Sequence, residues 1–270
     1  MSQKVVRREI LCKSILVKTG IQGFDYCINP YMGCSHACHY CYASFMCRFS
    51  GHREKWGCFV DIKINAPDIL SKQLKSRKKP NGKVLIGSVT DAYQPDEARY
   101  KITRSILELL VDNEMFEVHI LTKSNLVMRD ISVLSQFNMC KVGFTITTMN
   151  PRVARIIEPG APLPEMRLSA AREIKKSGIP VWVFIAPILP GITDTDESLS
   201  TLLFSLHESG IYDIRTDYLN PYPSVVHRLK NIYRKHFPFA LPYLHEYLIN
   251  PEIYKDSIKY RMERLLNKYR

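Results

Sequence analysis

The stretch Gly33 to Ala43 reads Gly-Cys-Ser-His-Ala-Cys-His-Tyr-Cys-Tyr-Ala and holds three of the eight cysteines of the chain. Cys34, Cys38 and Cys41 follow a C-x3-C-x2-C spacing. Three thiolates on one tight loop can each bind one iron of a [4Fe-4S] cube and leave the fourth iron without a protein ligand. A structural zinc ion takes four protein ligands, usually as two pairs. The loop therefore favours an iron–sulfur cluster with one iron open to a substrate or cofactor.

Zinc is the alternative interpretation of this loop. A fourth ligand could come from Cys47, Cys58, His36, His39 or His52, and these are residue types that zinc binds. Inert packing is a weaker explanation, because three cysteines separated by two histidines are hard to bury together as small apolar side chains. From this loop alone the identity of the metal stays open, with an iron–sulfur cluster favoured over zinc.

The length and composition predict a globular protein with one sizeable core. The chain has 270 residues, 46% of them hydrophobic. Its first eight residues are polar and charged, which predicts neither a signal peptide nor a membrane anchor. No apolar run approaches the ~20 residues that span a bilayer. Together with eight cysteines, this predicts a cytoplasmic protein with no membrane partner.

The net charge of +12 is concentrated near the carboxyl end. Residues 225–270 carry ten Lys or Arg against four Asp or Glu, together with six tyrosines. Basic and aromatic side chains can grip a nucleic-acid backbone and stack on bases. They can equally be the solvated faces of helices whose tyrosines pack inward, and this is the interpretation we favour.

Short apolar runs alternate with amphipathic helices along most of the chain, a rhythm that predicts a parallel sheet. Six such strands predict an α/β fold, a partial (β/α)6 TIM-type barrel with the cysteine loop after its first strand and additional helices at the carboxyl end. We expect a lead over residues 1–25, the barrel over 26–220 and a basic, tyrosine-rich extension over 221–270. Residues 50–66 have no clear periodicity and are predicted to be an inserted loop. The expected strands are 26–31, 84–89, 116–121, 142–147, 179–185 and 211–219, and the expected helices include 39–49, 68–76, 102–111, 126–137, 167–177, 199–209, 225–236 and 241–248.

Polar motifs follow the predicted strands at their carboxyl ends, where parallel α/β folds gather function. With the cysteine loop, these motifs resemble the radical S-adenosylmethionine (SAM) superfamily, in its spore photoproduct lyase-like branch, over about residues 29–194. Tyr40 is the aromatic residue that this superfamily has just before the third cysteine. The motifs are Thr90-Asp91-Ala92-Tyr93-Gln94-Pro95, Thr122-Lys123-Ser124, Glu158-Pro159-Gly160-Ala161-Pro162 and Ala186-Pro187-Ile188-Leu189-Pro190-Gly191.

The resemblance implies two cofactors, a [4Fe-4S] cluster and SAM. It implies that a reduced cluster cleaves SAM to methionine and a 5′-deoxyadenosyl radical, which abstracts hydrogen from a substrate. The electron donor would be a flavodoxin- or ferredoxin-type protein.

The same resemblance implies roles for side chains around the loop. Lys123 would meet the SAM carboxylate, and Thr147 the ribose or carboxylate. Glu158 and Arg167 are either SAM contacts or a structural ion pair. The remaining implied contacts are Ser88, Thr90 and Asp91 near the SAM amino group, Ile188 and Tyr40 at the adenine, and Tyr40, Tyr42 and Tyr93 as catalytic residues.

The substrate is less constrained. The lyase of this branch has a hydrogen-donating cysteine three positions before the motif aspartate, where this chain has Ser88. A serine O–H bond is too strong for that role, so we do not expect repair of spore photoproduct itself. A nucleic acid or nucleotide is slightly favoured as substrate over a peptide or metabolite. The alternative from another class is a non-catalytic iron–sulfur or zinc-stabilised nucleic-acid-binding protein.

Overall fold

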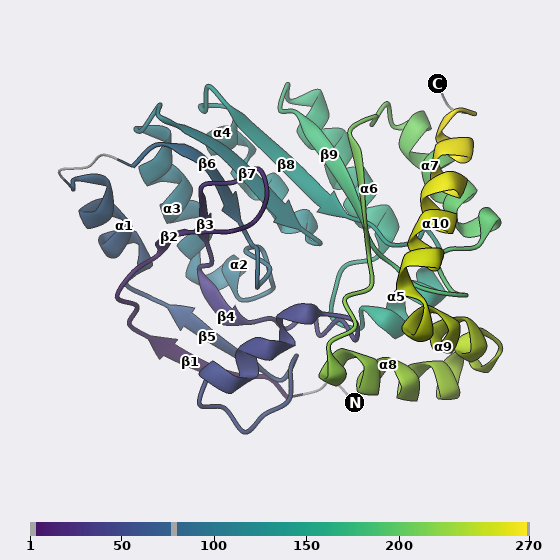
Figure 1. The fold of residues 1–270 in the computed structure, drawn as a ribbon. Helices are drawn as coiled ribbons and strands as arrows, with labels where there is room; N and C mark the ends of the chain where they lie inside the picture. The colour runs from purple at the N-terminus through teal and green to yellow at the C-terminus, as the bar shows by residue number, and fades with distance from the viewer. Residues whose placement is uncertain (1–3, 77–79, 269–270) are drawn as a thin grey trace.

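Parallel strands form the centre of the molecule. The computed structural model describes residues 4–76 and 80–268, so the first three residues of the predicted lead and the last two of the extension lie outside it. A seven-stranded sheet runs in the order β10-β9-β8-β7-β6-β3-β2 (Figure 1). Only β2 is antiparallel to its neighbour within this sheet. Its strands are β2 (Leu16–Lys18), β3 (Tyr26–Ile28), β6 (Gly82–Ile86), β7 (Phe116–Thr122), β8 (Cys140–Thr145), β9 (Val181–Ile188) and β10 (Ile214–Tyr218).

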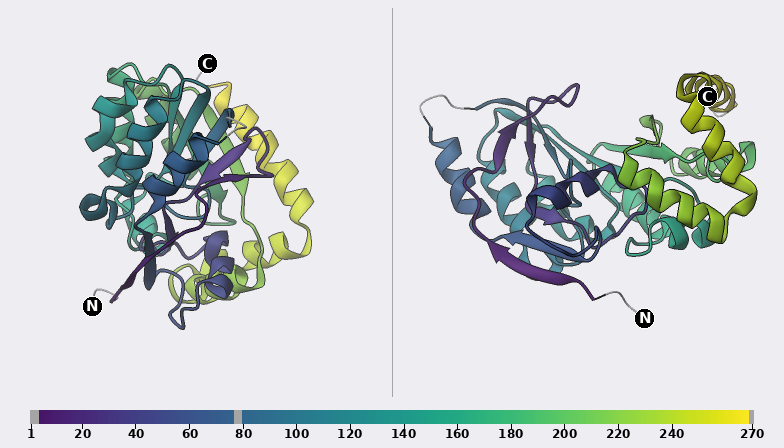
Figure 2. Two further views of the ribbon diagram at one scale, coloured as in Figure 1. Left: turned by 90° about the vertical axis from the view of Figure 1, so that its left-hand side faces the viewer. Right: turned by 60° about the horizontal axis from the view of Figure 1, so that its bottom comes forward.

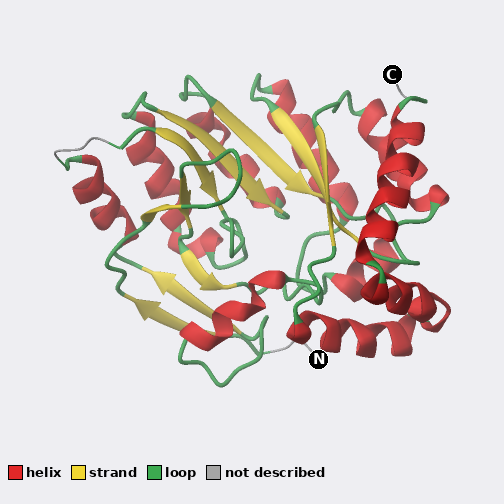
Figure 3. Cartoon of the chain, viewed as in Figure 1, coloured by secondary structure: helices red, strands yellow, loops and turns green. Residues whose placement is uncertain are grey.

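Helices between these strands complete an α/β partial barrel, which confirms the predicted fold class (Figure 3). Helix α3 shows why the helices form: its apolar residues recur at three- and four-residue spacing, and Ile106, Leu107 and Leu110 are fully buried. The helices of this part are α1 (Ala66–Leu74), α2 (Glu97–Tyr100), α3 (Ile102–Val111), η2 (Asn125–Asp130), α4 (Ile131–Leu134), α5 (Pro151–Ile157), α6 (Pro164–Lys176) and α7 (Asp196–Glu208).

A second sheet corrects the prediction of an inserted loop at residues 50–66. Strand β5 (Phe59–Lys63) pairs with β1 (Val6–Ile10) in parallel and with β4 (Tyr31–Gly33) in antiparallel. Asp61 interrupts the apolar run of β5, and its carboxylate lies 2.7 Å from His52 Nε2. Because this buried polar pair interrupts the apolar pattern, the strand is not recognised from its sequence.

Other element boundaries also differ from the predictions. The predicted helix 39–49 is a 3-10 helix, η1 (Tyr42–Phe49), because residues up to Cys41 belong to the cysteine loop. The predicted helix 126–137 is divided into η2 and α4. Helix α5 was not predicted; its N-cap is Asn150, whose side-chain oxygen accepts hydrogen bonds from Arg152 N and Val153 N.

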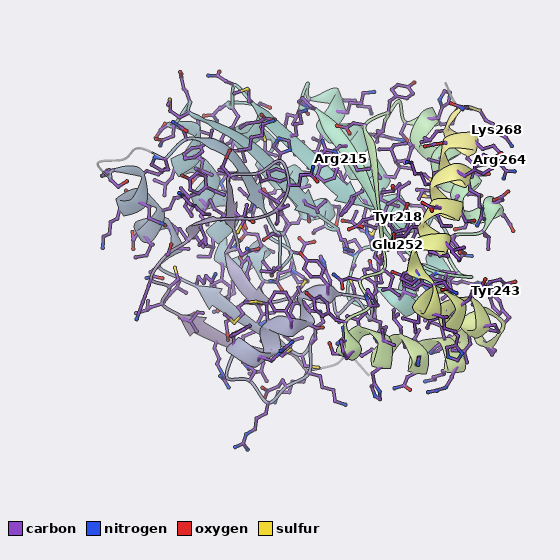
Figure 4. The ribbon with its side chains drawn as sticks, viewed as in Figure 1. Arg215, Tyr218, Tyr243, Glu252, Arg264 and Lys268 are labelled. Carbon is purple, nitrogen blue, oxygen red and sulfur yellow. The ribbon has the colours of Figure 1, made fainter. Side chains whose placement is uncertain are left out.

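The carboxyl-terminal helices pack on the side of the main sheet away from the N-terminal strands (Figure 2). Most of their buried apolar residues share a core with Cys38 and Tyr40 of the cysteine loop, whereas Ile258, Met262 and Leu265 pack in the main core. The Tyr218 hydroxyl of β10 donates to the Lys255 carbonyl at 3.1 Å, and Figure 4 labels Tyr218 at this junction. No helix within residues 4–76 and 80–268 has the length and apolarity to cross a membrane. The extension contains α8 (Pro223–His236), η3 (Pro238–Ala240), α9 (Leu241–Ile249) and α10 (Pro251–Leu266).

Candidate functional site

The cysteine loop connects β4 to η1 and carries three thiols at one end of the barrel. Cys34 and Cys38 are buried, Cys41 is half-buried, and none of them forms a disulfide. Burial raises the pKa of all three thiols, that of Cys38 to about 12. The three lie within Coulombic range of one another, since the charges of Cys38 and Cys41 further raise the pKa of Cys34. Close, buried thiols of this kind become thiolates when a metal binds them.

The backbone of the loop is fixed by close contacts and by the Thr90–Gln94 motif. Gly33 has φ +82°, and a Cβ there would lie 2.4 Å from the Phe59 carbonyl oxygen. The Thr90 hydroxyl donates to the Gly33 carbonyl at 2.6 Å. The Gln94 side chain accepts from Ser35 N at 2.9 Å and donates to Thr90 Oγ1 at 3.2 Å. Thr90 therefore supports the loop through the hydroxyl for which a SAM contact was predicted.

Gly160 of the Glu-Pro-Gly-Ala-Pro motif contacts the cysteine loop through its backbone. Its N–H donates to the His36 carbonyl at 3.0 Å. A Cβ at this position would lie 2.1 Å from the Ser35 carbonyl oxygen, well inside contact distance. The motif therefore requires glycine so that two backbone segments can meet.

We expect Gly160→Ala to displace the loop and to destabilise the protein by about 1–3 kcal/mol, the usual cost of overpacking. Gly20→Ala is the matched control, because a Cβ at Gly20 has nothing within 4 Å. Thermal unfolding of both variants measures the difference. Equal melting temperatures for Gly160→Ala and Gly20→Ala would contradict the proposed contact.

A buried ion pair lies next to Tyr40 in the middle of the loop. Arg167 Nη2 donates to Glu158 Oε2 at 2.5 Å, and the Tyr40 hydroxyl donates to Glu158 Oε1. Thr147 Oγ1 lies 3.4 Å from the same carboxylate. Burial would raise the pKa of Glu158, but the charges of Arg167 and Lys123 outweigh it and lower the pKa. Glu158 is thus an anion that orients the phenol of Tyr40, and Arg167 is its structural partner.

Asp91 fixes the segment that carries Lys123. Its carboxylate accepts from Thr122 Oγ1 at 2.6 Å and from Lys123 N at 2.7 Å. His36 Nδ1 is 3.3 Å away, within ion-pair distance but outside hydrogen-bond geometry, and neither ring nitrogen of His36 has a hydrogen-bond partner among the described residues. Burial would raise the pKa of Asp91, but His36 and these hydrogen bonds hold it far below its usual value. Asp91 is therefore a fixed anion in the wall of the site.

Lys123 points back toward the cysteine loop from the end of β7. Its ammonium group lies 5.6 Å from the centroid of the Tyr40 ring. Burial would lower its pKa, but the nearby Cys38 and Glu158 outweigh burial and raise the pKa. The Lys123 charge also lowers the pKa of Cys38 and Cys41. Lys123 is thus a permanent cation beside two of the three thiols.

Tyr42 joins the loop to the end of β6. Its hydroxyl donates to the Ser88 carbonyl at 2.6 Å, while Asn29 Nδ2 donates to Ser88 Oγ at 2.9 Å. Asn29 Nδ2 also lies 3.9 Å from Cys27 Sγ. The structure thus brings Tyr40, Tyr42, Ser88, Thr90, Asp91, Lys123, Thr147, Glu158 and Arg167 together around Cys34, Cys38 and Cys41.

Two predicted residues have side chains in the main core rather than against the cysteine loop. Tyr93 is fully buried, and its hydroxyl donates to Asp130 at 3.1 Å in a network with Arg129, so its placement gives no support to a catalytic role. Ile188 has no exposed surface and belongs to the main core, so it offers no open face to adenine. Both residues belong to motifs, but their side chains stabilise the fold.

Arg228 of α8 makes a contact that no sequence pattern predicts. Its side chain reaches the loop and donates to the carbonyls of His39 and Cys41, each at 3.1 Å. The two partners are almost 190 residues away in the chain. A basic residue on an amphipathic helix predicts a solvated face, and no local pattern distinguishes this one.

The donor set fits an iron–sulfur cube, because each thiolate of a cube binds a different iron and three thiolates leave the fourth iron without a protein ligand. A structural zinc ion takes four protein ligands. Two buried thiols and the half-buried Cys41 thiol, with the cations Lys123 and Arg228 beside the loop, suit the negative charge of a thiolate-bound cluster.

Fold and site define a partial α/β barrel with a three-cysteine cluster loop at the carboxyl ends of its strands. The model of the Radical SAM superfamily matches residues 28–203, and the chain belongs to this superfamily. Membership implies an enzyme that uses SAM with an iron–sulfur cluster.

The relatives found by sequence have no described activity. An uncharacterised protein of Methanocaldococcus jannaschii is 38% identical over 196 residues, 73% of each chain. An uncharacterised protein of Mycobacterium tuberculosis is 29% identical over 285 aligned positions, covering 97% of this chain and 80% of its own.

Solved structures of spore photoproduct lyase have a similar fold. A lyase mutant with bound AdoMet and dinucleoside spore photoproduct gives a TM-score of 0.67 at 18% identity, over 86% of this chain. The match spans 66% of that lyase, just under two thirds of its length. Another lyase mutant gives a TM-score of 0.73 at 16% identity, over 97% of this chain and 79% of its own. At these identities the likeness shows the fold alone.

Proposed function

We propose that this chain is a radical SAM enzyme whose Cys34, Cys38 and Cys41 hold a [4Fe-4S] cluster. The observation that carries the proposal is the geometry of the loop, which holds the buried thiols of Cys34 and Cys38 and the half-buried thiol of Cys41 at the strand ends, with Lys123 beside Cys38 and Cys41. The chemistry that such a cluster supplies when reduced is one-electron cleavage of SAM to methionine and a 5′-deoxyadenosyl radical, which then takes hydrogen from a substrate.

The side chains of this chain would bind and orient SAM. Lys123 is the cation for its carboxylate, because its ammonium group lies beside the loop and stays protonated. The backbone carbonyls between Ser88 and Asp91 would accept hydrogen bonds from the SAM amino group, and Thr147 would meet the ribose or carboxylate. Glu158 and Arg167 act indirectly, since they fix the side chain of Tyr40 within the loop.

We expect Lys123→Gln to weaken SAM binding about 10- to 100-fold, the cost of losing one charge-assisted hydrogen bond of about 1.5–3 kcal/mol. Lys83→Gln removes the same charge from an exposed side chain near the start of β6 and is the control. Equilibrium binding of SAM to both reconstituted variants measures the effect. Equal affinities of the two variants for SAM would show that Lys123 does not contact SAM.

Anaerobic reconstitution with iron and sulfide tests the function. The expected product is a brown protein with about four irons per chain that releases methionine and 5′-deoxyadenosine from SAM under dithionite. A colourless protein that retains zinc would instead favour the non-catalytic nucleic-acid-binding alternative.

We propose a nucleic acid or nucleotide as the substrate, ahead of a peptide or metabolite. Support comes from Arg234, Lys235 and His236, all exposed at the end of α8 near the exposed aromatic rings of Phe239 and Tyr243. Other parts of the extension are less available: Tyr233 and Tyr247 are buried, and Arg261 and Arg264 pair with Asp196.

Salt dependence tests the substrate class. A nucleic-acid substrate predicts binding to single-stranded DNA or RNA that weakens steeply as salt rises. Weak binding without salt dependence would favour a peptide or small metabolite. Repair of spore photoproduct is not expected, because Ser88 has an O–H in place of the weak S–H bond of a hydrogen donor.

We also propose a flavodoxin- or ferredoxin-type electron donor and a cytoplasmic location. No disulfide joins the eight cysteines, all of which lie in the described ranges, as expected of a reducing compartment.

A further inference from the structure

Arg228 connects the carboxyl-terminal extension to the cysteine loop. Its Nε donates to the His39 carbonyl, and its Nη2 donates to the Cys41 carbonyl and to Ser44 Oγ, all at 3.1 Å. A second contact lies beside it, where the hydroxyls of Ser44 and Ser224 are 3.3 Å apart. One guanidinium group therefore spans the end of the loop and the start of η1.

The contact fixes the Cys41 end of the loop. The two carbonyls bound by Arg228 flank Tyr40 and belong to a segment without helix or strand. One of the two carbonyls belongs to Cys41, which is the most exposed of the three cysteines. A planar group with several donors can hold two carbonyls at once, which a flexible ammonium group does less well.

The position of Arg228 on α8 makes the contact firm. Val225, Leu229 and Tyr233 form the buried stripe of this helix, in a core shared with Cys38 and Tyr40. Arg228 adjoins that stripe and is half-buried. Its charge is within Coulombic range of Cys41 and Cys47. In a partly buried setting such a charge is screened less than at an exposed surface.

We propose that Arg228 is a positioning residue that holds the Cys41 arm of the loop and raises the reduction potential of the cluster. The inference rests on the proposed function. Reduction adds one negative charge to the cluster, so a fixed cation nearby stabilises the reduced form more than the oxidised form. The extension is then part of the redox site, and its basic composition has a purpose besides substrate binding.

Three variants of the 270-residue chain, reconstituted anaerobically, separate the effect of Arg228 on the loop from its effect on the reduction potential. Arg228→Gln removes the charge and most of the hydrogen-bond donors. Arg228→Lys keeps the charge but lacks the planar guanidinium group that can donate to two carbonyls at once. Arg172→Gln removes the same charge from an exposed position on α6 and is the control. The measurements are the cluster midpoint potential, by redox titration, and the rate of iron loss to a chelator.

We expect a lower potential in Arg228→Gln and a potential near that of the wild type in Arg228→Lys and Arg172→Gln. Iron loss should be about 10- to 100-fold faster in both Arg228 variants, as for other residues that orient metal ligands. Equal potentials in Arg228→Gln and Arg172→Gln would overturn the proposal. If Arg228→Gln holds too little iron to titrate, iron loss from Arg228→Lys decides: faster loss supports the role, and wild-type loss overturns it.

The wild-type protein separates this proposal from the proposed function. If the wild type binds four irons and the Arg228 variants match it in potential and in iron loss, only the role of Arg228 is overturned. A wild type that binds no cluster would overturn the function, and the role of Arg228 with it. Thermal unfolding of each variant shows whether a loss of iron reflects a loss of fold.

Discussion

Cys38→Ala is expected to lose the cluster and to reduce SAM cleavage to background. Cys38 is buried in the core shared by the loop and the carboxyl-terminal helices, beside Lys123 and Glu158. Without its thiolate, a cube would keep two protein ligands, and a second iron would be open to solvent and chelators. Iron per chain and 5′-deoxyadenosine formed under dithionite are the two measurements.

Cys140→Ala is the matched control for this change. Cys140 is also buried, but it lies at the start of β8 and packs in the main core. Its loss should cost some stability through the small cavity left behind and should leave iron content and SAM cleavage unchanged. Four irons in Cys38→Ala would mean that the metal is held by other residues.

Arg167→Met is expected to destabilise the protein by about 3–5 kcal/mol, the cost of leaving one partner of a buried ion pair without the other. Arg167 and Glu158 are both fully buried, and Arg167 also donates to the carbonyls of Thr145 and Pro162. Methionine fills a similar volume but supplies none of these hydrogen bonds. Denaturant unfolding of the reconstituted protein measures the change.

Lys176→Met provides the comparison for an exposed ion pair. Lys176 pairs with Glu173 at 2.8 Å on the surface of α6, where such a pair contributes less than about 1 kcal/mol. A loss in Arg167→Met no greater than in Lys176→Met would show that Glu158 is not held as an anion in the native protein. Tyr40 would then lack its orienting partner.

The barrel could be predicted from the sequence because its strands are short apolar runs separated by amphipathic helices. The same rhythm places Asp91, Lys123 and Glu158 after successive strands, and parallel strand ends meet at one edge. The site residues therefore come together as a consequence of topology, with Cys34, Cys38 and Cys41 on the loop beside them.

The second sheet and Arg228 could not be predicted in this way. Strand β5 pairs with β1 across more than fifty residues, and its buried Asp61 breaks the apolar pattern. Arg228 meets its partners only after the barrel and extension have packed, so its surroundings are absent from its local sequence. Such contacts depend on tertiary structure rather than on periodicity.

Motif membership also predicted more than the side chains support. Tyr93 follows Asp91 by two residues, and its own N–H binds the Asp91 carboxylate at 2.9 Å, but its ring turns into the core toward Asp130. Thr90 and Gln94 support the backbone of the cysteine loop. Polar residues of a motif can thus support the backbone of the loop instead of contacting the ligand.

The central claim is that three thiolates leave one iron open to SAM. Electron paramagnetic resonance of the dithionite-reduced protein, recorded with and without SAM, tests it most directly. We predict a [4Fe-4S]+ signal that changes shape when SAM is added, because SAM binds the open iron. A signal that SAM leaves unchanged, or a protein that holds zinc and gives no signal, would contradict the account.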